Sequence, residues 1–304
     1  MRGGAGDEAI LARVQAADSH AVTPRAVAAH PNGVQRIQPS SWLVPIDIGE
    51  LWRYRELVRF LVLRDVKSRY RQTYLGPSWA ILRPLLQIVV FSAIFGGLAH
   101  IKTGTSVPYA LWVAPAVIVF AYLSTALANT STSLVTNSHL ITKVYFPRLY
   151  IPISTAVTPV VDFLLGLLVL TGVFAYYDRA PSWRIVFLPA FLALLVLVTM
   201  GIGLWLAAFT ARYRDIVFGA PFLVQIWQYA TPVIYPVTFI PPTYRWILDF
   251  NPLTAVVEGF RWSLFGLPFP STTTLAASVC IGLGATTSGL FAFRRSERLM
   301  VDML

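Results

Sequence analysis

Long apolar stretches, separated by short charged turns, run through residues 77–304. Arg83 and Lys102 enclose 18 residues without a charge, which is about 27 Å of helix and enough to cross the hydrocarbon core of a bilayer. Further stretches of this kind lie within 107–128, 148–178, 184–212, 215–245 and 261–294, the second of them interrupted only by Asp162. The pattern predicts an all-α integral membrane protein with six transmembrane helices.

Residues 51–74 have a different pattern. Val58, Val62, Val66 and Tyr70 recur four apart, which is the spacing of one helix face. Basic residues surround this stripe and are the candidates for contact with lipid head groups: Arg59, Arg64, Lys67, Arg69 and Arg71. The stretch predicts an amphipathic helix in the headgroup layer rather than a plain soluble helix, and Gly76-Pro77 ends it. We therefore divide the chain into a disordered cytoplasmic tail (1–40), an amphipathic interface helix region (41–76) and a six-span transmembrane domain (77–304).

Composition supports the membrane assignment and sets an orientation. Hydrophobic residues make up 56% of the 304 residues and charged residues only 12%, with a mean hydropathy of +0.63. This excludes an ordinary soluble enzyme and a disordered protein. With both termini in the cytoplasm, nineteen Lys and Arg residues lie inside and five outside, as the positive-inside rule requires. The net charge of +10 therefore needs no nucleic-acid partner.

Catalytic and metal-binding motifs are missing from the sequence. It has one cysteine, Cys280, four scattered histidines and no Gly-Lys dipeptide, so it contains no phosphate-binding loop of the GxxxxGK[ST] type. It also lacks HExxH and GxSxG. We expect neither an enzyme nor a bound cofactor or metal in this chain.

Asp162 and the aromatic residues of the spans are the candidates for a transport path. Placing a carboxylate within a membrane span costs free energy, so Asp162 either serves transport or forms hydrogen bonds between packed helices. The aromatic residues form either an interfacial belt or a channel wall along which sugar C–H faces slide. The candidate channel residues are Trp112, Phe120, Tyr122, Asp162, Trp227 and Tyr229.

Two segments between the predicted spans contain apolar side chains that a simple exposed loop would not need. Residues 137–148 mix charge with exposed apolar side chains such as Leu140 and Phe146, which favours a docking surface on the cytoplasmic side. Residues 235–270 are amphipathic and rich in proline. We expect them to form short helices that dip partway back into the membrane.

Five separated motifs resemble one transporter family. RDVKSRYRQTYLGPSWAILRPL (64–85) is similar to the opening of type-2 ABC exporter permeases for O-antigen, capsule and teichoic acid. KVYFPRL (143–149), YRDI (213–216), TPVIYP (231–236) and NPLTAVVEGFRW (251–262) resemble its later landmarks, in the same order. The resemblance covers residues 45–295, and the tail before it is longer than the family usually carries.

This resemblance implies the transmembrane subunit of an exporter for a lipid-linked polysaccharide in the bacterial cytoplasmic (inner) membrane. Such a permease is a homodimer with two copies of a separate subunit that binds ATP and Mg. The channel forms between the two protomers, and residues 235–262 guard its outer exit, with Tyr235, Phe239, Trp246 and Phe250 as gate. Residues 137–148 would form the cytoplasmic coupling helix, which sits in a cleft of the ATPase. The coupling residues toward the ATPase would be Asn137, His139, Leu140, Lys143, Tyr145, Phe146, Arg148, Arg214 and Asp215.

Two other functions remain open from the residues alone. A proton-coupled secondary transporter would use Asp162, but it predicts inverted repeats and further buried ionisable groups. A membrane glycosyltransferase acting on a polyprenyl lipid needs clustered carboxylates at the membrane face. Asp47, Glu50, Glu56 and Asp65 lie there, and two of them are more simply salt-bridge partners within the basic helix.

Overall fold

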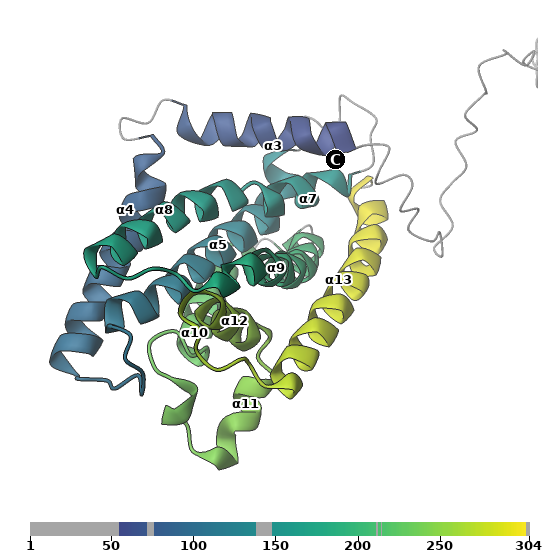
Figure 1. Ribbon diagram of the computed structural model, residues 1–304. Coiled ribbons are helices and arrows are strands. Elements are labelled where there is room, and N and C mark those ends of the chain that lie inside the picture. Colours follow the sequence, from purple (N-terminus) through teal and green to yellow (C-terminus); the bar gives the residue numbers. More distant parts are fainter. Residues whose placement is uncertain (1–54, 72–75, 138–147, 211, 214, 302–304) are drawn as a thin grey trace, which may run out of the picture. The chain divides into compact units, whose positions relative to one another are not determined.

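Every regular element in the described part of the chain is a helix (Figure 1). The computed structural model describes residues 55–71, 76–137, 148–210, 212–213 and 215–301, and the surroundings of side chains as far as residue 296. These residues all belong to one unit, which runs from Asp47 to Leu304. The all-helical prediction is confirmed. The predicted disordered tail (1–40) and the first part of the interface region (41–54) lie outside the described residues.

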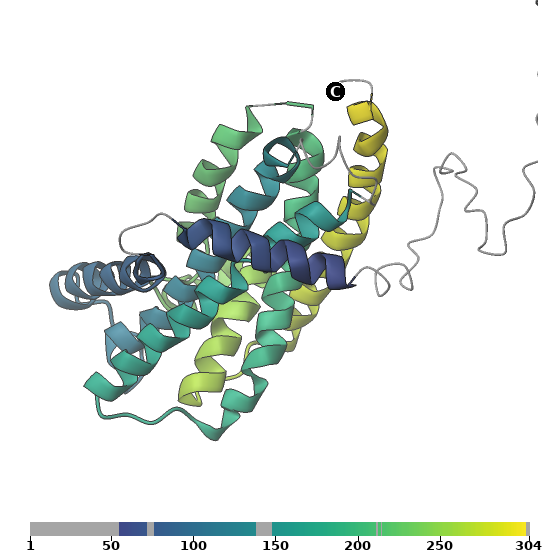
Figure 2. The same cartoon turned by 90° about the horizontal axis from the view of Figure 1, so that it is seen from above.

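The basic segment forms α3, Arg55–Tyr70. Figures 1 and 2 together show that α3 lies across one end of the other helices. It packs against α7, Tyr150–Val157. Leu61 is buried and the predicted stripe of Val58, Val62 and Val66 is half-buried, whereas Phe60 and Leu63 are exposed. Apolar side chains of α3 therefore lie both against the neighbouring helices and on its exposed side.

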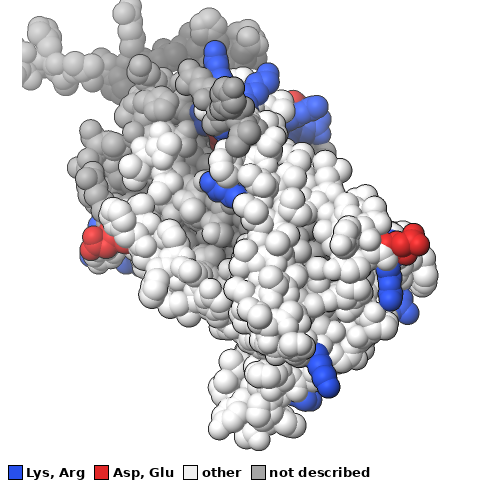
Figure 3. Space-filling view, turned by 90° about the vertical axis from the view of Figure 1, so that its left-hand side faces the viewer, with Lys and Arg blue, Asp and Glu red and all other residues white. Residues whose placement is uncertain are grey.

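Five helical segments of the described chain are long and apolar enough to cross a membrane. The first is α4, Ser78–Phe91, prolonged by a π-helical segment η1, Ser92–Leu98. The others are α5, Tyr109–Thr136; α7 with α8, Val160–Tyr176; η2, Trp183–Phe187, with α9, Leu188–Thr210; and α13, Thr272–Val301. Figure 3 shows a broad uncharged area with charged side chains mainly toward its edges. The chain is a multi-pass membrane protein.

The remaining predicted span, within residues 215–245, is shorter than expected. It forms α10, Ile216–Ala230, whose 15 residues reach only about 22 Å. The helix ends because Thr231 takes an extended conformation and Pro232 cannot donate a helical hydrogen bond. The described chain thus contains five full-length candidate spans and one shorter apolar helix where six spans were predicted.

Short helices follow α10, as the sequence predicted. They are η3, Val237–Phe239; η4, Pro242–Tyr244; α11, Arg245–Asp249; and α12, Pro252–Phe265. The Asn251 side chain accepts a hydrogen bond from the Leu253 backbone N–H and so caps the start of α12, and Gly266, with a φ of +68°, ends it. Most of α12 is buried against α5, α9 and α13. That these helices dip back into the membrane stays a prediction.

Helix α5 forms the centre of the fold. Its most apolar window is 78% buried within the protein, against 11% for the window of α4–η1. It packs against α4, α7, α8, α9, α10 and α12. A helix that is apolar all round and covered by neighbours on most sides is a core helix even in a membrane protein.

Helices α9 and α13 approach each other closely at glycine. A Cβ added at Gly201 would lie 2.6 Å from the backbone nitrogen of Thr286, and one at Gly289 would lie 2.7 Å from the carbonyl oxygen of Gly201. Both distances are far below ordinary van der Waals contact, so only glycine fits. Small residues let helix backbones meet in this way in membranes, where apolar side chains gain little over lipid contact.

Candidate functional site

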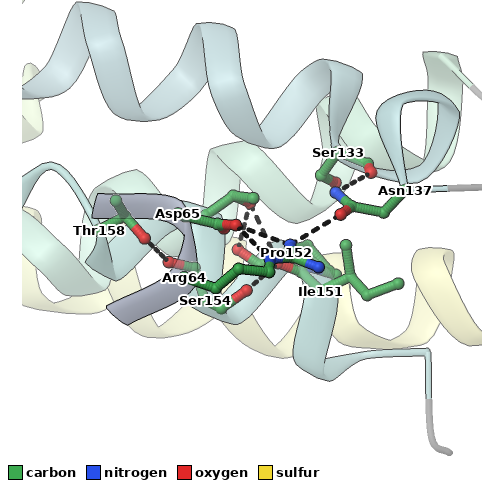
Figure 4. A network of polar contacts seen from close by, with 9 residues as sticks. Arg64, Asp65, Ser133, Asn137, Ile151, Pro152, Ser154 and Thr158 are labelled. Atoms are coloured by element: carbon green, nitrogen blue, oxygen red, sulfur yellow. Dashed lines mark hydrogen bonds and ion pairs between the residues drawn. The ribbon is translucent and has the colours of Figure 1, made fainter. Parts of the chain in front are cut away.

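A first polar cluster joins α3 to the end of α5 (Figure 4). The Arg64 guanidinium donates hydrogen bonds to the Asp65 carboxylate (2.6 Å) and to the side-chain carbonyl of Asn137 (2.8 Å). The Asn137 amide in turn donates to the Ser133 carbonyl at 2.9 Å. Asn137 is buried and caps the C-terminus of α5. The cluster therefore fixes α3 to the point where the predicted docking segment begins.

A second cluster joins α3 to α8. Arg69 forms an ion pair with the Asp162 carboxylate, and the Tyr70 hydroxyl donates a hydrogen bond to its other oxygen. Burial, reinforced by the nearby Asp162 carboxylate, raises the pKa of the Tyr70 hydroxyl to about 12. Tyr70 therefore keeps its proton and stays a donor over the whole physiological pH range.

The position of Asp162 changes how this residue is interpreted. It lies midway along Tyr150–Tyr176 by residue count, but α7 and α8 are separate helices, and Asp162 is in the first turn of α8. There it contacts the interface helix instead of facing the apolar middle of a span. Its partners make it an ion-paired residue, which is the helix-packing alternative for a carboxylate at this position.

A cavity of about 350 Å³ lies beside this second cluster. Its lining includes the charged and polar side chains of Arg69, Tyr70, Arg83 and Asp162 and the apolar side chains of Ile118 and Phe163. Gly76, Trp79, Ala80, Pro84, Ala121, Tyr122, Thr125, Asn129 and Gly166 complete the lining. The cavity thus lies where α3, α4, α5 and α8 meet.

The predicted head-group residues fall into two sets. Arg59, Lys67 and Arg71 are exposed along α3. Arg64 and Arg69 turn inward and are engaged by Asp65, Asn137 and Asp162. Helical spacing alone did not separate these sets, because two of the acceptors, Asn137 and Asp162, lie 73 and 93 residues away along the chain.

Most of the predicted coupling residues cannot be placed. His139, Leu140, Lys143, Tyr145, Phe146 and Arg214 lie outside the described residues. Of the others, Asn137 is buried, Arg148 is half-buried just before α7, and Asp215 is exposed at the start of α10.

The predicted channel residues are also divided. Trp112, Phe120 and Tyr122 are buried inside the protein, where Tyr122 donates a hydrogen bond to the Ala156 carbonyl and stacks edge-on with Phe163. Trp227 is half-buried and donates a hydrogen bond to Asn251. Tyr229 is exposed. The channel interpretation requires exposed side chains, so within this chain Tyr229 meets the requirement and the buried three do not.

Tyr229 belongs to an exposed aromatic face of α10. Phe218 is 82% exposed and Phe222 is 63% exposed, and with Gln225 and Tyr229 they follow a helical spacing of about four. Ala220 and Val224 are its only buried residues. The predicted gate residues lie just beyond: Phe239, Trp246 and Phe250 are exposed, and half-buried Tyr235 bonds through its hydroxyl to the Tyr229 carbonyl.

Arg261 is a functional candidate that sequence reasoning missed. Only 4% of it is exposed. Its guanidinium donates hydrogen bonds to the carbonyls of Trp112 (3.2 Å), Pro232 (2.8 Å) and Val233 (3.0 Å). It thereby connects α12, the start of α5 and the turn that ends α10. The signal available in the sequence was an arginine three residues after Glu258 in a mostly apolar helix, downstream of a stretch broken by proline.

Residues 56–265 match the family described as ABC-2 type transporter. The chain belongs to the ABC-2 type transporter family. The match begins in α3 and ends with α12, so both polar clusters, the cavity and Arg261 lie inside the ABC-2 region. The predicted resemblance to type-2 ABC exporter permeases is therefore confirmed.

Named relatives of this ABC-2 protein include permeases of polysaccharide export. The O-antigen export system permease protein RfbA of Myxococcus xanthus is 28% identical over 254 residues, which cover 82% of this chain and 96% of that protein. RfbA of Klebsiella pneumoniae is 24% identical, covering 82% and 95%. The polysialic acid transport protein KpsM of Escherichia coli is 23% identical, covering 80% and 95%. By their names, these three relatives are transport proteins rather than enzymes.

Proposed function

We propose that this chain is the transmembrane subunit of an ATP-driven exporter that moves a lipid-linked cell-surface polysaccharide out of a bacterium. The observation that carries the proposal is the alignment with O-antigen and polysialic acid permeases over at least 95% of their length. O-antigen, capsule and teichoic acid are the candidate cargo classes. The membrane is the cytoplasmic (inner) membrane, with both termini on the cytoplasmic side.

A separate ATP-binding subunit supplies the energy. The sequence has no Gly-Lys dipeptide and hence no phosphate-binding loop of that type, so ATP and Mg bind the partner. The partner docks on residues 137–148 and on the neighbouring Arg214 and Asp215. The Arg64–Asn137 contact supports this arrangement, because it connects the beginning of that segment to α3 and α5 simultaneously.

The exporter contains two copies of this chain, with the channel between them. The exposed face of α10 supports this proposal, since Phe218, Phe222, Gln225 and Tyr229 present flat rings and an amide to whatever adjoins them. Aromatic rings of this kind suit the C–H faces of sugars. Tyr235, Phe239, Trp246 and Phe250 form the outer gate at the end of the same helix.

The exposed basic side chains of α3 face the lipid head groups. Arg59, Lys67 and Arg71 are exposed, and a cationic residue near an anionic membrane surface contributes about 1 kcal/mol of attraction. With exposed Phe60 and Leu63 on the same helix, this composition is that of an interfacial helix.

Purification from the native membrane in mild detergent tests the proposal. We expect an ATP-binding subunit in equal stoichiometry and vanadate-sensitive ATP hydrolysis. A folded protein that purifies alone, without ATPase activity, would refute the exporter assignment.

The proton-coupled alternative predicts a different result. If Asp162 carried protons, a protonophore would stop export even at constant ATP. We expect no such effect, because Asp162 is already engaged by Arg69 and Tyr70. Of the carboxylates that the glycosyltransferase alternative would use, Glu56 and Asp65 are paired with Arg55 and Arg64 within α3.

A further inference from the structure

The cavity between α3, α4, α5 and α8 has an excess of positive charge. Arg69 and Arg83 both line it, whereas Asp162 is its only acidic lining residue. Arg69 is paired with Asp162. Arg83 lies near the Trp79 ring, 6.0 Å from its centroid, and no ion pair with a carboxylate is found for it among the described residues. The lining therefore retains one uncompensated guanidinium.

The lining of the cavity also has an apolar part. It includes Ile118, Phe163 and Gly166, and Gly166 is close enough that an added Cβ would lie 2.9 Å from Ile118. The cavity adjoins α4, whose side chains Leu86, Val89 and Val90 are exposed. A ligand that enters from the bilayer would thus bring an apolar chain along α4 and an anionic head to the arginines.

The volume limits the size of that head. At about 30 Å³ for each water-sized group, a cavity of about 350 Å³ holds roughly a dozen such groups. A phosphate has five heavy atoms and a diphosphate nine, so either fits together with the first carbons of a chain. Guanidinium groups bind phosphate oxygens through paired N–H donors, which makes phosphate the anion of choice for two arginines.

We propose that this cavity binds the phosphate or diphosphate head of a membrane lipid, with Arg83 and Arg69 as its donors. Binding draws Arg69 away from Asp162, since the phosphate offers more negative charge than one carboxylate. The ion pair that joins α3 to α8 is then exchanged for a contact with the lipid. This inference rests on the proposed function, where the lipid is the carrier of the cargo, but the binding site is defined by this chain alone.

Calorimetric titration of the full chain in phosphatidylcholine nanodiscs tests the site, with geranyl diphosphate as probe. We expect R83Q to weaken binding about tenfold or more, because one charge-assisted donor pair is lost. R212Q is the matched control: Arg212 is exposed but does not line the cavity, so binding should change less than about twofold. If an ATP-binding subunit co-purifies, its nucleotide site is common to all variants and cancels in the comparison.

The decisive variant is D162N. Removing the competing carboxylate frees Arg69, so D162N should bind geranyl diphosphate more tightly than the natural protein. A residue that merely held the fold would weaken binding or leave it unchanged on substitution, and either result would overturn the proposed exchange. Unchanged affinity in R83Q would overturn the site itself.

Probes of different composition identify the source of the phosphate. Inorganic diphosphate, which lacks the chain, and geraniol, which lacks the phosphate, should both bind far more weakly; equal binding of either would refute a lipid head-group site. Competition by phosphatidylglycerol in the nanodisc would assign the site to bulk anionic lipid, and resistance to it would assign the site to a diphosphate carrier. These titrations need no transport, so their failure leaves the exporter proposal to the co-purification experiment.

Discussion

The Arg261 guanidinium lies over the Trp112 indole, with its central carbon 3.4 Å from the ring centroid. Trp112 belongs to α5 and Arg261 to α12, so the contact joins residues 149 positions apart. A cation against an aromatic face is favourable when water is excluded. The same guanidinium also satisfies the carbonyls of Pro232 and Val233, which have no helical partner because α10 ends at Ala230.

Replacing Arg261 with glutamine should destabilise the protein strongly. The substitution leaves the Pro232 and Val233 carbonyls without donors, at about 1–3 kcal/mol for each, so we expect a total loss of about 2–6 kcal/mol. Thermal unfolding in detergent, followed by loss of the monodisperse peak, measures it. Arg245→Gln is the matched control, because Arg245 is half-buried and bonds only the Ile240 carbonyl. Equal unfolding temperatures for the two variants would contradict the structural role of Arg261.

Glycine at the α9–α13 contact should not tolerate a methyl group. Gly201→Ala and Gly289→Ala must push the two backbones apart, and overpacking of this kind costs about 1–3 kcal/mol. Gly284→Ala lies on α13 with nothing within 4 Å of the added Cβ, so it should be neutral or slightly stabilising. The same unfolding assay would refute the close approach if all three variants behaved alike.

The Arg64–Asn137 contact should matter for coupling. Arg64→Gln weakens the connection between α3 and the end of α5, so we expect ATP hydrolysis to continue while export per ATP falls several-fold. Arg59→Gln removes an exposed charge from the same helix and serves as control. Both quantities are measured on the exporter in proteoliposomes. A normal ratio of export to ATP hydrolysis in Arg64→Gln would show that this contact is not needed for coupling.

Cross-linking can test whether α10 meets its copy in a homodimer. In a Cys280→Ser background, Phe222→Cys places a thiol on the exposed face, and oxidation of native membranes should give a disulfide-linked dimer. Val224→Cys, on the buried face of the same helix, should stay monomeric. A dimer band from neither variant, or from both equally, would argue against this interface.

Tyr70 predicts a pH dependence with a definite sign. Its pKa is raised from about 10 in the unfolded chain to about 12 in the fold, so its contribution to stability is fully present below pH 10 and is lost as the pH rises through 12. The stability difference between the natural protein and Tyr70→Phe should therefore be constant from pH 6 to 9 and shrink above pH 10. Unfolding midpoints at each pH supply the measurement, and a difference that grows with pH would contradict the assignment.

The parts of the fold that follow from local pattern were predictable. Charge-free stretches between Arg83 and Lys102, or between Arg184 and Arg212, contain helices because the bilayer leaves the backbone no other partner. The stripe of Val58, Val62 and Val66 predicted the helix α3 from its spacing alone. That α3 lies in the headgroup layer stays a prediction.

Features that depend on contacts between distant segments were not predictable. The charges of Asp215 and Arg245 bounded a span, yet the chain leaves the helix at Thr231, before the second charge is reached. Arg261 was counted as an outer-side charge although it is buried. Asp162 was interpreted without Arg69 and Tyr70 because its partners precede it by more than 90 residues. In each case the deciding group belongs to another helix.

The glycine contact between α9 and α13 joins these two helices into one rigid pair. Because their backbones touch, neither helix can slide or tilt against the other without a steric clash. Helices α4 and α10 have little buried surface, so shifting them breaks few contacts. A rearrangement that opens a passage should therefore move α4 and α10 relative to the rigid α9–α13 pair. The free energy of opening then depends on how many contacts α4 and α10 lose when they move.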